Sequence, residues 1–195
     1  MANSGKLYQW ALQRTESKHA PLWVGLFFFL ELVLFIPLDV VLIFFCLQNR
    51  SRIPLYIMIA TIASALSASI GYLLGHFLWD LIGPYIVPKL ISLSAFERFS
   101  GHYQAHESLA VFLGAFLPFP MKVLSLSAGV FHISFLPFLL FVFLARTLRF
   151  SLIGISMFLW GEKVKAVVDR HFHRILLILG AKISLGFALF YLFAN

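Results

Sequence analysis

The chain has 195 residues, of which 61% are hydrophobic and only 12% are charged, and its mean hydropathy is +0.93. Soluble domains carry about 25% charged residues, and a domain this small could not hide so much apolar surface, so a water-soluble globule is excluded. We therefore expect an all-α integral membrane protein. The net charge of +7 comes from basic residues at the ends of apolar runs, which indicates membrane topology and not nucleic-acid binding.

The first 20 residues are polar to amphipathic and predict a cytoplasmic segment at the membrane surface. The first apolar run, residues 21–47, is long enough to cross a hydrocarbon core about 30 Å thick. Glu31, Pro37 and Asp39 interrupt its middle. We expect a broken helix here, because proline removes a backbone donor and blocks the preceding turn.

The second run, residues 53–79, contains no Asp, Glu, Lys or Arg and predicts a transmembrane helix. Small residues recur on it at every fourth position: Ala63, Ser67, Gly71 and Gly75. A face of this kind lets another helix approach closely, so we expect helix packing at Gly71 and Gly75. Residues 80–108 are more polar and are expected at an interface or in water, with an amphipathic helix on the membrane surface.

The third run, residues 109–131, is also broken in its middle, by Pro118, Pro120 and Lys122. Its break resembles the earlier one: residues 37–41 and residues 120–124 both read proline, apolar, charged, valine, apolar, with charges of opposite sign. Broken helices in paired positions are the sequence pointer to transporter repeats. We expect two re-entrant broken-helix hairpins in an inverted repeat, with two kinked spanning helices as the alternative.

The fourth run, residues 133–160, carries Arg146 and Arg149, which share a helix face. A polar, basic hinge at 161–174 and a last apolar run at 175–193 follow. The expected fold thus has about three transmembrane helices besides the hairpins. We divide it into residues 1–20, a membrane domain at 21–162, and the hinge with a C-terminal transmembrane helix at 163–195.

Charged side chains at membrane depth form the candidate site. Each costs at least about 2.5–3.5 kcal/mol at the bilayer centre, so we expect opposite signs to pair inside the bundle. Two guanidiniums on one face also suit a phosphate, and buried carboxylates can carry a proton. The predicted substrate and proton site consists of Glu31, Asp39, Lys122, Arg146 and Arg149. A static salt-bridge network is the structural alternative.

Other chemistry has little support in the sequence. His102 and His106 lie four residues apart, but no further metal ligands are near them. No nucleophile–base pair and no phosphate-binding glycine loop is visible. We expect no cofactor, no metal and no enzymatic reaction.

Five segments, in this order and spacing, resemble the motifs of one family. They are Glu31 with Phe35-Ile36-Pro37-Leu38-Asp39, Gly71-Tyr72-Leu73-Leu74-Gly75, residues 116–123, residues 128–135, and Arg146-Thr147-Leu148-Arg149-Phe150. The family is the DedA family, also called the VTT-domain or SNARE-associated Golgi protein family, and the second hairpin has the form of its YqaA-like branch. The likeness covers residues 22–162. The chain departs from the pattern in having one proline in the first motif and Ala145 where glycine often stands.

The resemblance implies two oppositely inserted re-entrant hairpins and translocation of lipids, either a polyprenyl-phosphate carrier or phospholipids. It implies functional roles for Glu31, Asp39, Arg146 and Arg149, with Lys122 as the basic residue of the second hairpin. Membrane lipids are then the partners, while proton coupling and oligomeric state stay open. A small-ion or solute transporter and a non-transporting scaffold are the alternative functions.

Basic residues predict the orientation. Segments 1–20, 48–52 and 161–174 carry nine Lys and Arg residues, against two, Lys89 and Arg98, on the other side. The positive-inside rule therefore predicts a cytoplasmic N-terminus in a multi-pass protein, with the bacterial inner membrane as the expected location. The same count results whether the hairpins are re-entrant or spanning.

Overall fold

The structure is a computed structural model that describes residues 17–33, 38–90, 107–117 and 119–194, with the backbone alone for residues 80, 82–90, 107 and 165–194. Every element in these ranges is a helix, which confirms the all-α expectation. They are α2 (Ala20–Phe29), the 3-10 helix η1 (Leu30–Leu32), α3 (Leu38–Gln48), the 3-10 helix η2 (Arg50–Arg52), α4 (Ile53–Leu90), α6 (Glu107–Phe116), α7 (Met121–Val130) and α8 (Phe135–Ala194). Pro37 and Pro118 lie outside the described residues.

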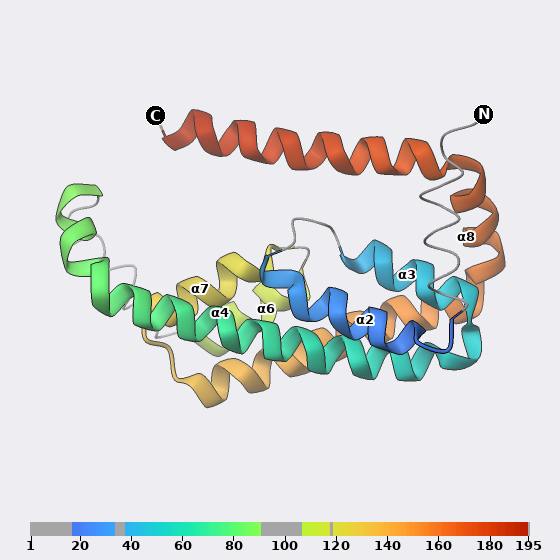
Figure 1. Cartoon of the computed structure of the whole chain (residues 1–195), viewed down its shortest axis with the longest axis horizontal. Coiled ribbons are helices and arrows are strands. Elements are labelled where there is room, and N and C mark those ends of the chain that lie inside the picture. Colours follow the sequence, from blue (N-terminus) through green and yellow to red (C-terminus); the bar gives the residue numbers. More distant parts are fainter. Residues whose placement is uncertain (1–16, 34–37, 91–106, 118, 195) are drawn as a thin grey trace.

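Both broken runs form helical hairpins. Figure 1 shows α2 running toward the middle of the molecule and α3 running back from it, and α6 and α7 form a similar pair from the opposite end. Helix α7 begins directly after Pro120, whose extended backbone ends the turn between the two helices of the second hairpin. Proline suits this position because its fixed φ angle and missing N–H cost nothing before the first helical turn.

The long helices α4 and α8 join the two hairpins. One core cluster packs α2 and α3 on the first half of α4 and on α8 around Phe150, while a second cluster packs α6 and α7 on the second half of α4 and the start of α8. Phe28 of α2 and Phe150 of α8 are fully buried and meet edge to face, with ring centroids 5.0 Å apart. Each hairpin therefore has its own core against the same two helices.

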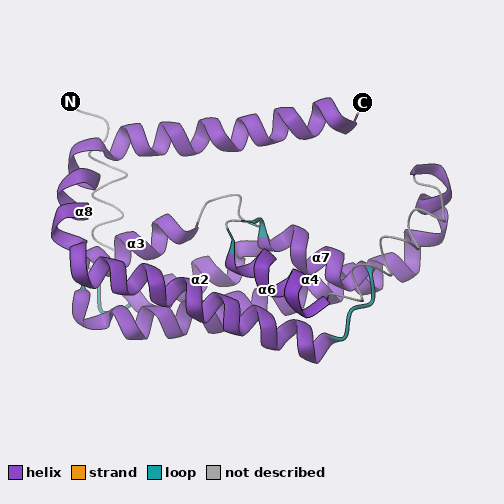
Figure 2. Ribbon diagram, turned by 180° about the vertical axis from the view of Figure 1, so that it is seen from behind, coloured by secondary structure: helices purple, strands orange, loops and turns teal. Residues whose placement is uncertain are grey.

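Two helices are longer than the sequence indicated. Helix α4 continues past residue 79 to Leu90, so the first part of the stretch expected at an interface is helical. Helix α8 continues through residues 161–174, so the expected hinge is part of a helix, whose path bends in this region (Figure 2). Polar composition marks where a helix leaves an apolar environment, but it does not by itself break the backbone pattern. Within residues 80–108, where we expected an amphipathic helix on the membrane surface, residues 91–106 lie outside the described residues.

Large apolar side chains cover the outside of the molecule. Along α8 they recur at intervals of three or four residues, in an exposed stripe formed by Leu136, Leu140, Leu144, Leu148, Leu152, Ile155 and Leu159. In the part of the chain that the structure describes, two segments are long and apolar enough to cross a membrane. We call these segments, Arg50–Trp79 and Phe135–Val164, the candidate spans. A contiguous apolar surface of this extent is typical of contact with lipid or with another protein.

Candidate functional site

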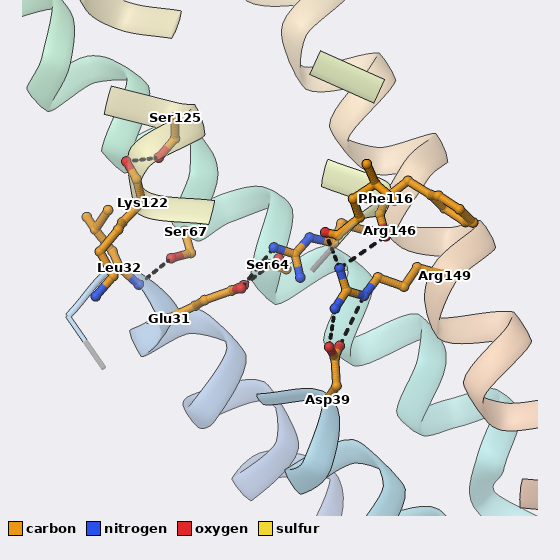
Figure 3. Close-up of polar contacts among 11 residues, drawn as sticks. Glu31, Leu32, Asp39, Ser64, Ser67, Phe116, Lys122, Ser125, Arg146 and Arg149 are labelled. Atoms are coloured by element: carbon orange, nitrogen blue, oxygen red, sulfur yellow. Dashed lines mark hydrogen bonds and ion pairs between the residues drawn. The ribbon is translucent and has the colours of Figure 1, made fainter. Parts of the chain in front are cut away.

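A buried carboxylate–arginine pair lies at the end of the first helix of the first hairpin. Arg146 of α8 donates from Nη2 to Glu31 Oε1 of η1 at 2.8 Å. The second oxygen of Glu31 accepts a hydrogen bond from Ser64 of α4, also at 2.8 Å (Figure 3). Arg146 is only 3% exposed and the Glu31 side chain 15% exposed, so this pair is withdrawn from the surface.

A second pair joins the two hairpins. Arg149, one helical turn after Arg146, donates from Nε to Asp39 Oδ1 at 3.2 Å and from Nη2 to Asp39 Oδ2. Its third nitrogen, Nη1, donates to the backbone carbonyls of Phe116, at 3.1 Å, and of Leu117. Asp39 lies in the first turn of α3, the second helix of the first hairpin, and Phe116 ends α6, the first helix of the second hairpin. One guanidinium therefore binds the first turn of α3 and the end of α6 at once, and so joins the two hairpins.

Lys122 is the fifth charged residue of this region. It lies in the first turn of α7, is half-buried and interacts electrostatically with Glu31. In Figure 3 the Lys122 side chain extends toward the segment that carries Glu31 and Leu32. The same segment is bonded to α4, because the backbone N–H of Leu32 donates to the hydroxyl of Ser67 at 3.2 Å. We call Glu31, Asp39, Lys122, Arg146 and Arg149 the central cluster. Its three basic and two acidic residues carry a net charge of +1 when all are ionised.

Glycines on α4 determine how closely the second hairpin approaches. A Cβ atom added at Gly75 would overlap the backbone carbonyl of Leu126, and one added at Gly71 would overlap the side chain of Ser125. Both contacts belong to α7, whose Gly129 in turn approaches the carbonyl of Tyr72. Close packing of these two backbones holds α7, with Lys122 in its first turn, against the middle of α4.

The cluster lies at the mid-length of both candidate spans. Ser64 is near the middle of Arg50–Trp79, and Arg149 is at the middle of Phe135–Val164. The structure thus brings together all five charged residues that the sequence selected. Their part in transport stays a prediction.

The sequence reasoning missed the neutral members of the site. These are the hydroxyls of Ser64 and Ser67 and the carbonyls of Phe116 and Leu117. The recurrence of small residues in the second apolar run included Ser67, but we interpreted it as a packing surface. Backbone carbonyls carry no sequence signal. Among the described residues, no group of three or more His, Cys, Asp or Glu side chains is placed to hold a metal ion, and His102 and His106 lie outside them.

Comparison with known proteins identifies the family. Residues 36–159 match the VTT domain. An uncharacterized protein of Haemophilus influenzae is 29% identical over 163 residues, which cover 83% of this chain and 84% of that protein. An uncharacterized protein of Histophilus somni is 33% identical over 150 residues, covering 76% and 78% of the two chains. No solved structure matches. The domain match covers the second helix of the first hairpin, the whole second hairpin, the first candidate span and most of the second. The chain therefore belongs to the membrane-associated VTT-domain (DedA) family.

Proposed function

We propose that this protein moves amphiphilic lipids with a phosphate-bearing headgroup from one side of a membrane to the other, as a transporter or scramblase. The observation that carries this proposal is the position of the two carboxylate–arginine pairs. They lie at the mid-length of the two candidate spans, where α3 begins and α6 ends. An anionic headgroup crossing a bilayer needs cationic and polar partners at this depth.

A purely structural role accounts poorly for these charges. Replacing a buried ion pair by well-packed apolar residues is often neutral or stabilising, so stability alone gives little reason to keep five ionised groups in an apolar protein. Ionisable residues inside a membrane more often mark a substrate or proton pathway. The net charge of +1 on the central cluster favours an anion over a cation as the substrate.

The transport cycle that we propose exchanges one anion for another. In the resting state Glu31 and Asp39 neutralise Arg146 and Arg149. A headgroup phosphate would compete with a carboxylate for its arginine, and the displaced carboxylate would become neutral by taking up a proton. This exchange would couple lipid movement to protons, since a carboxylate without its partner is costly at this depth. Polyprenyl phosphates and phospholipids both offer the required headgroup.

We propose that both hairpins are re-entrant and form an inverted repeat. Arg50, just after α3, lies 3.7 Å from Glu162 of α8, so the return end of the first hairpin is at the same end of the molecule as residue 162. This arrangement supports a shared side for segments 48–52 and 161–174. The proposed topology has a cytoplasmic N-terminus in a bacterial inner membrane, with a third span formed by the last part of α8.

Reconstitution into phosphatidylcholine vesicles with a trace of acyl-labelled phosphatidylglycerol tests the proposal. A membrane-impermeant quencher reports the labelled lipid that reaches the outer leaflet. We expect the wild-type protein to speed this movement, and Arg146→Ala and Asp39→Ala to abolish the effect, while Arg50→Ala keeps it. Wild-type rates in both cluster variants would overturn the mechanism.

The same vesicles separate the alternative functions. A small-ion transporter would dissipate an imposed proton or ion gradient without moving the labelled lipid. A scaffold would move neither, and its cellular activity would survive an exchange of the paired charges, Asp39→Arg with Arg149→Asp. Lipid translocation requires no bond to be made or broken, so we propose no enzymatic step.

A further inference from the structure

The two arginines of the central cluster use their donors very differently. A guanidinium offers five N–H groups. Arg149 uses Nε, Nη1 and Nη2 in four hydrogen bonds, two to Asp39 and two to the carbonyls of Phe116 and Leu117. It has almost no capacity left for a ligand. A phosphate could bind Arg149 only by breaking the contact between the two hairpins.

Arg146 uses few of its N–H donors. Within the described part of the chain it donates one hydrogen bond, to Glu31, and its Nε atom is buried with no hydrogen-bond partner. The guanidinium carbon lies 5.5 Å from the centre of the Phe150 ring, which supports the plane of the guanidinium from one side. A buried cation with unused donors is unfavourable in the ligand-free protein, and a ligand that accepts hydrogen bonds from these donors would remove that cost.

Two buried hydroxyls of α4, those of Ser64 and Thr61, do not form the usual hydrogen bond of a helical hydroxyl. Helical hydroxyls elsewhere donate back to the carbonyl four residues earlier, as in Ser69, Thr147 and Ser156. Ser64 donates to Glu31 instead. Thr61, one turn before Ser64 and on the same buried face, is 2% exposed, and its hydroxyl has no partner among the described residues. A buried hydroxyl without a partner is unfavourable, so Thr61 offers an unused donor on the same face of α4 as Ser64.

We propose that Arg146, Ser64 and Thr61 form the anion site that receives the lipid phosphate. Glu31 occupies this site in the resting state. Arg149 joins the two hairpins and does not contact the headgroup. This inference rests on the proposed function and assigns different roles to the two arginines of the central cluster. Glu31 presents two oxygens, one to Arg146 and one to Ser64, each at 2.8 Å. Two oxygens of a phosphate can take the same places, with the Thr61 hydroxyl and Arg146 Nε as further donors.

Ligand binding to the full chain in a neutral detergent tests these separate roles. The probe is dodecyl phosphate, with inorganic phosphate and dodecyltrimethylammonium as comparisons, and binding is followed by the shift of the tryptophan-monitored melting temperature. We expect Thr61→Val to weaken dodecyl phosphate binding about tenfold, the effect of one lost hydrogen bond to a charged group. Ser64→Ala should weaken it less, because the Ser64 hydroxyl also binds Glu31 in the ligand-free protein. Ser69→Ala, on the same helix but bonded to its own backbone, should bind like wild type.

Two further readouts distinguish a ligand-binding role from a structural one. Thr61→Val removes an unpartnered buried hydroxyl, so the ligand-free variant should melt at a higher temperature than wild type although it binds more weakly. Arg149→Lys should slow lipid movement in vesicles and change the dissociation constant of dodecyl phosphate less than about threefold, since it removes none of the proposed phosphate donors.

The outcomes separate this inference from the proposed function. The anion site is wrong if Thr61→Val binds dodecyl phosphate like wild type, or if Arg149→Lys weakens binding as much as Thr61→Val does. It is also wrong if the wild type moves lipid but does not bind dodecyl phosphate. Inorganic phosphate binding as tightly as dodecyl phosphate would exclude a lipid headgroup as the ligand. A wild type that binds through these residues yet moves no lipid would overturn the proposed function and leave the site standing.

Discussion

Arg149 binds both carboxylate oxygens of Asp39, a residue 110 positions earlier in the chain, through Nε and Nη2. The planar fork of the guanidinium matches a carboxylate in this way, which the single ammonium of lysine cannot do. The remaining nitrogen binds the end of α6. The two hairpins therefore cannot separate at this point unless Arg149 releases one of them.

Arg149→Lys should loosen this contact without removing the charge. We expect the free energy of unfolding to fall by about 1–3 kcal/mol, because the carbonyls of Phe116 and Leu117 lose their donor. The lipid transport rate should fall about tenfold. Arg50→Lys is the control: its partner Glu162 is 90% exposed, and such pairs contribute about 0–1 kcal/mol. Wild-type transport in Arg149→Lys would contradict the role of Arg149 in joining the hairpins.

Glu31→Gln should destabilise the ligand-free protein and make it more responsive to anions. Arg146 keeps its burial but loses its counter-charge, and breaking one side of a buried pair costs about 3–5 kcal/mol. Dodecyl phosphate should then raise the melting temperature more in the variant than in wild type, because its phosphate replaces the missing negative charge. Equal shifts would mean that Glu31 and the ligand do not compete. Glu162→Gln is the exposed control.

Replacing the whole Glu31–Arg146 pair should separate stability from function. The double variant Glu31→Leu with Arg146→Met should have the same free energy of unfolding as wild type, or one up to about 4 kcal/mol higher. Each single change should be strongly destabilising. Lipid transport should be absent in the double variant. Chemical unfolding of all four proteins and the vesicle assay provide both readouts. A double variant that retains full cellular activity would favour the scaffold function.

Gly75→Ala should push α7 away from α4. The new methyl group would meet the backbone of Leu126, which cannot rotate aside, so we expect a loss of about 1–3 kcal/mol in the free energy of unfolding. Gly25→Ala is the matched control, since its methyl group would meet only a side-chain carbon of Ile59, 3.2 Å away. Thermal unfolding of both variants in detergent measures the difference. Equal stabilities would show that the backbones can separate without cost.

Several features of this protein were accessible from local sequence. The apolar runs, their breaks and the charges within them follow from the cost of exposing backbone or charge to lipid, which each segment must satisfy on its own. For this reason the positions of the breaks near Asp39 and Pro120 agree with the helix boundaries observed, and five charged residues could be selected for one site. The extents of α4 and α8 were less accessible, because polar residues do not interrupt the helical backbone pattern.

The pairing inside the site depended on helix packing over long distances in the chain. Glu31 and Arg146 are 115 residues apart, and nothing in either segment indicates that Glu31 pairs with Arg146 and Asp39 with Arg149. That choice follows from how the first hairpin packs against α4 and α8. The unpartnered hydroxyl of Thr61 is a product of the same packing. The local sequence of a segment reflects whether that segment lies in lipid or in water. The partners of a side chain, in contrast, are determined by surfaces that meet only when the helices pack.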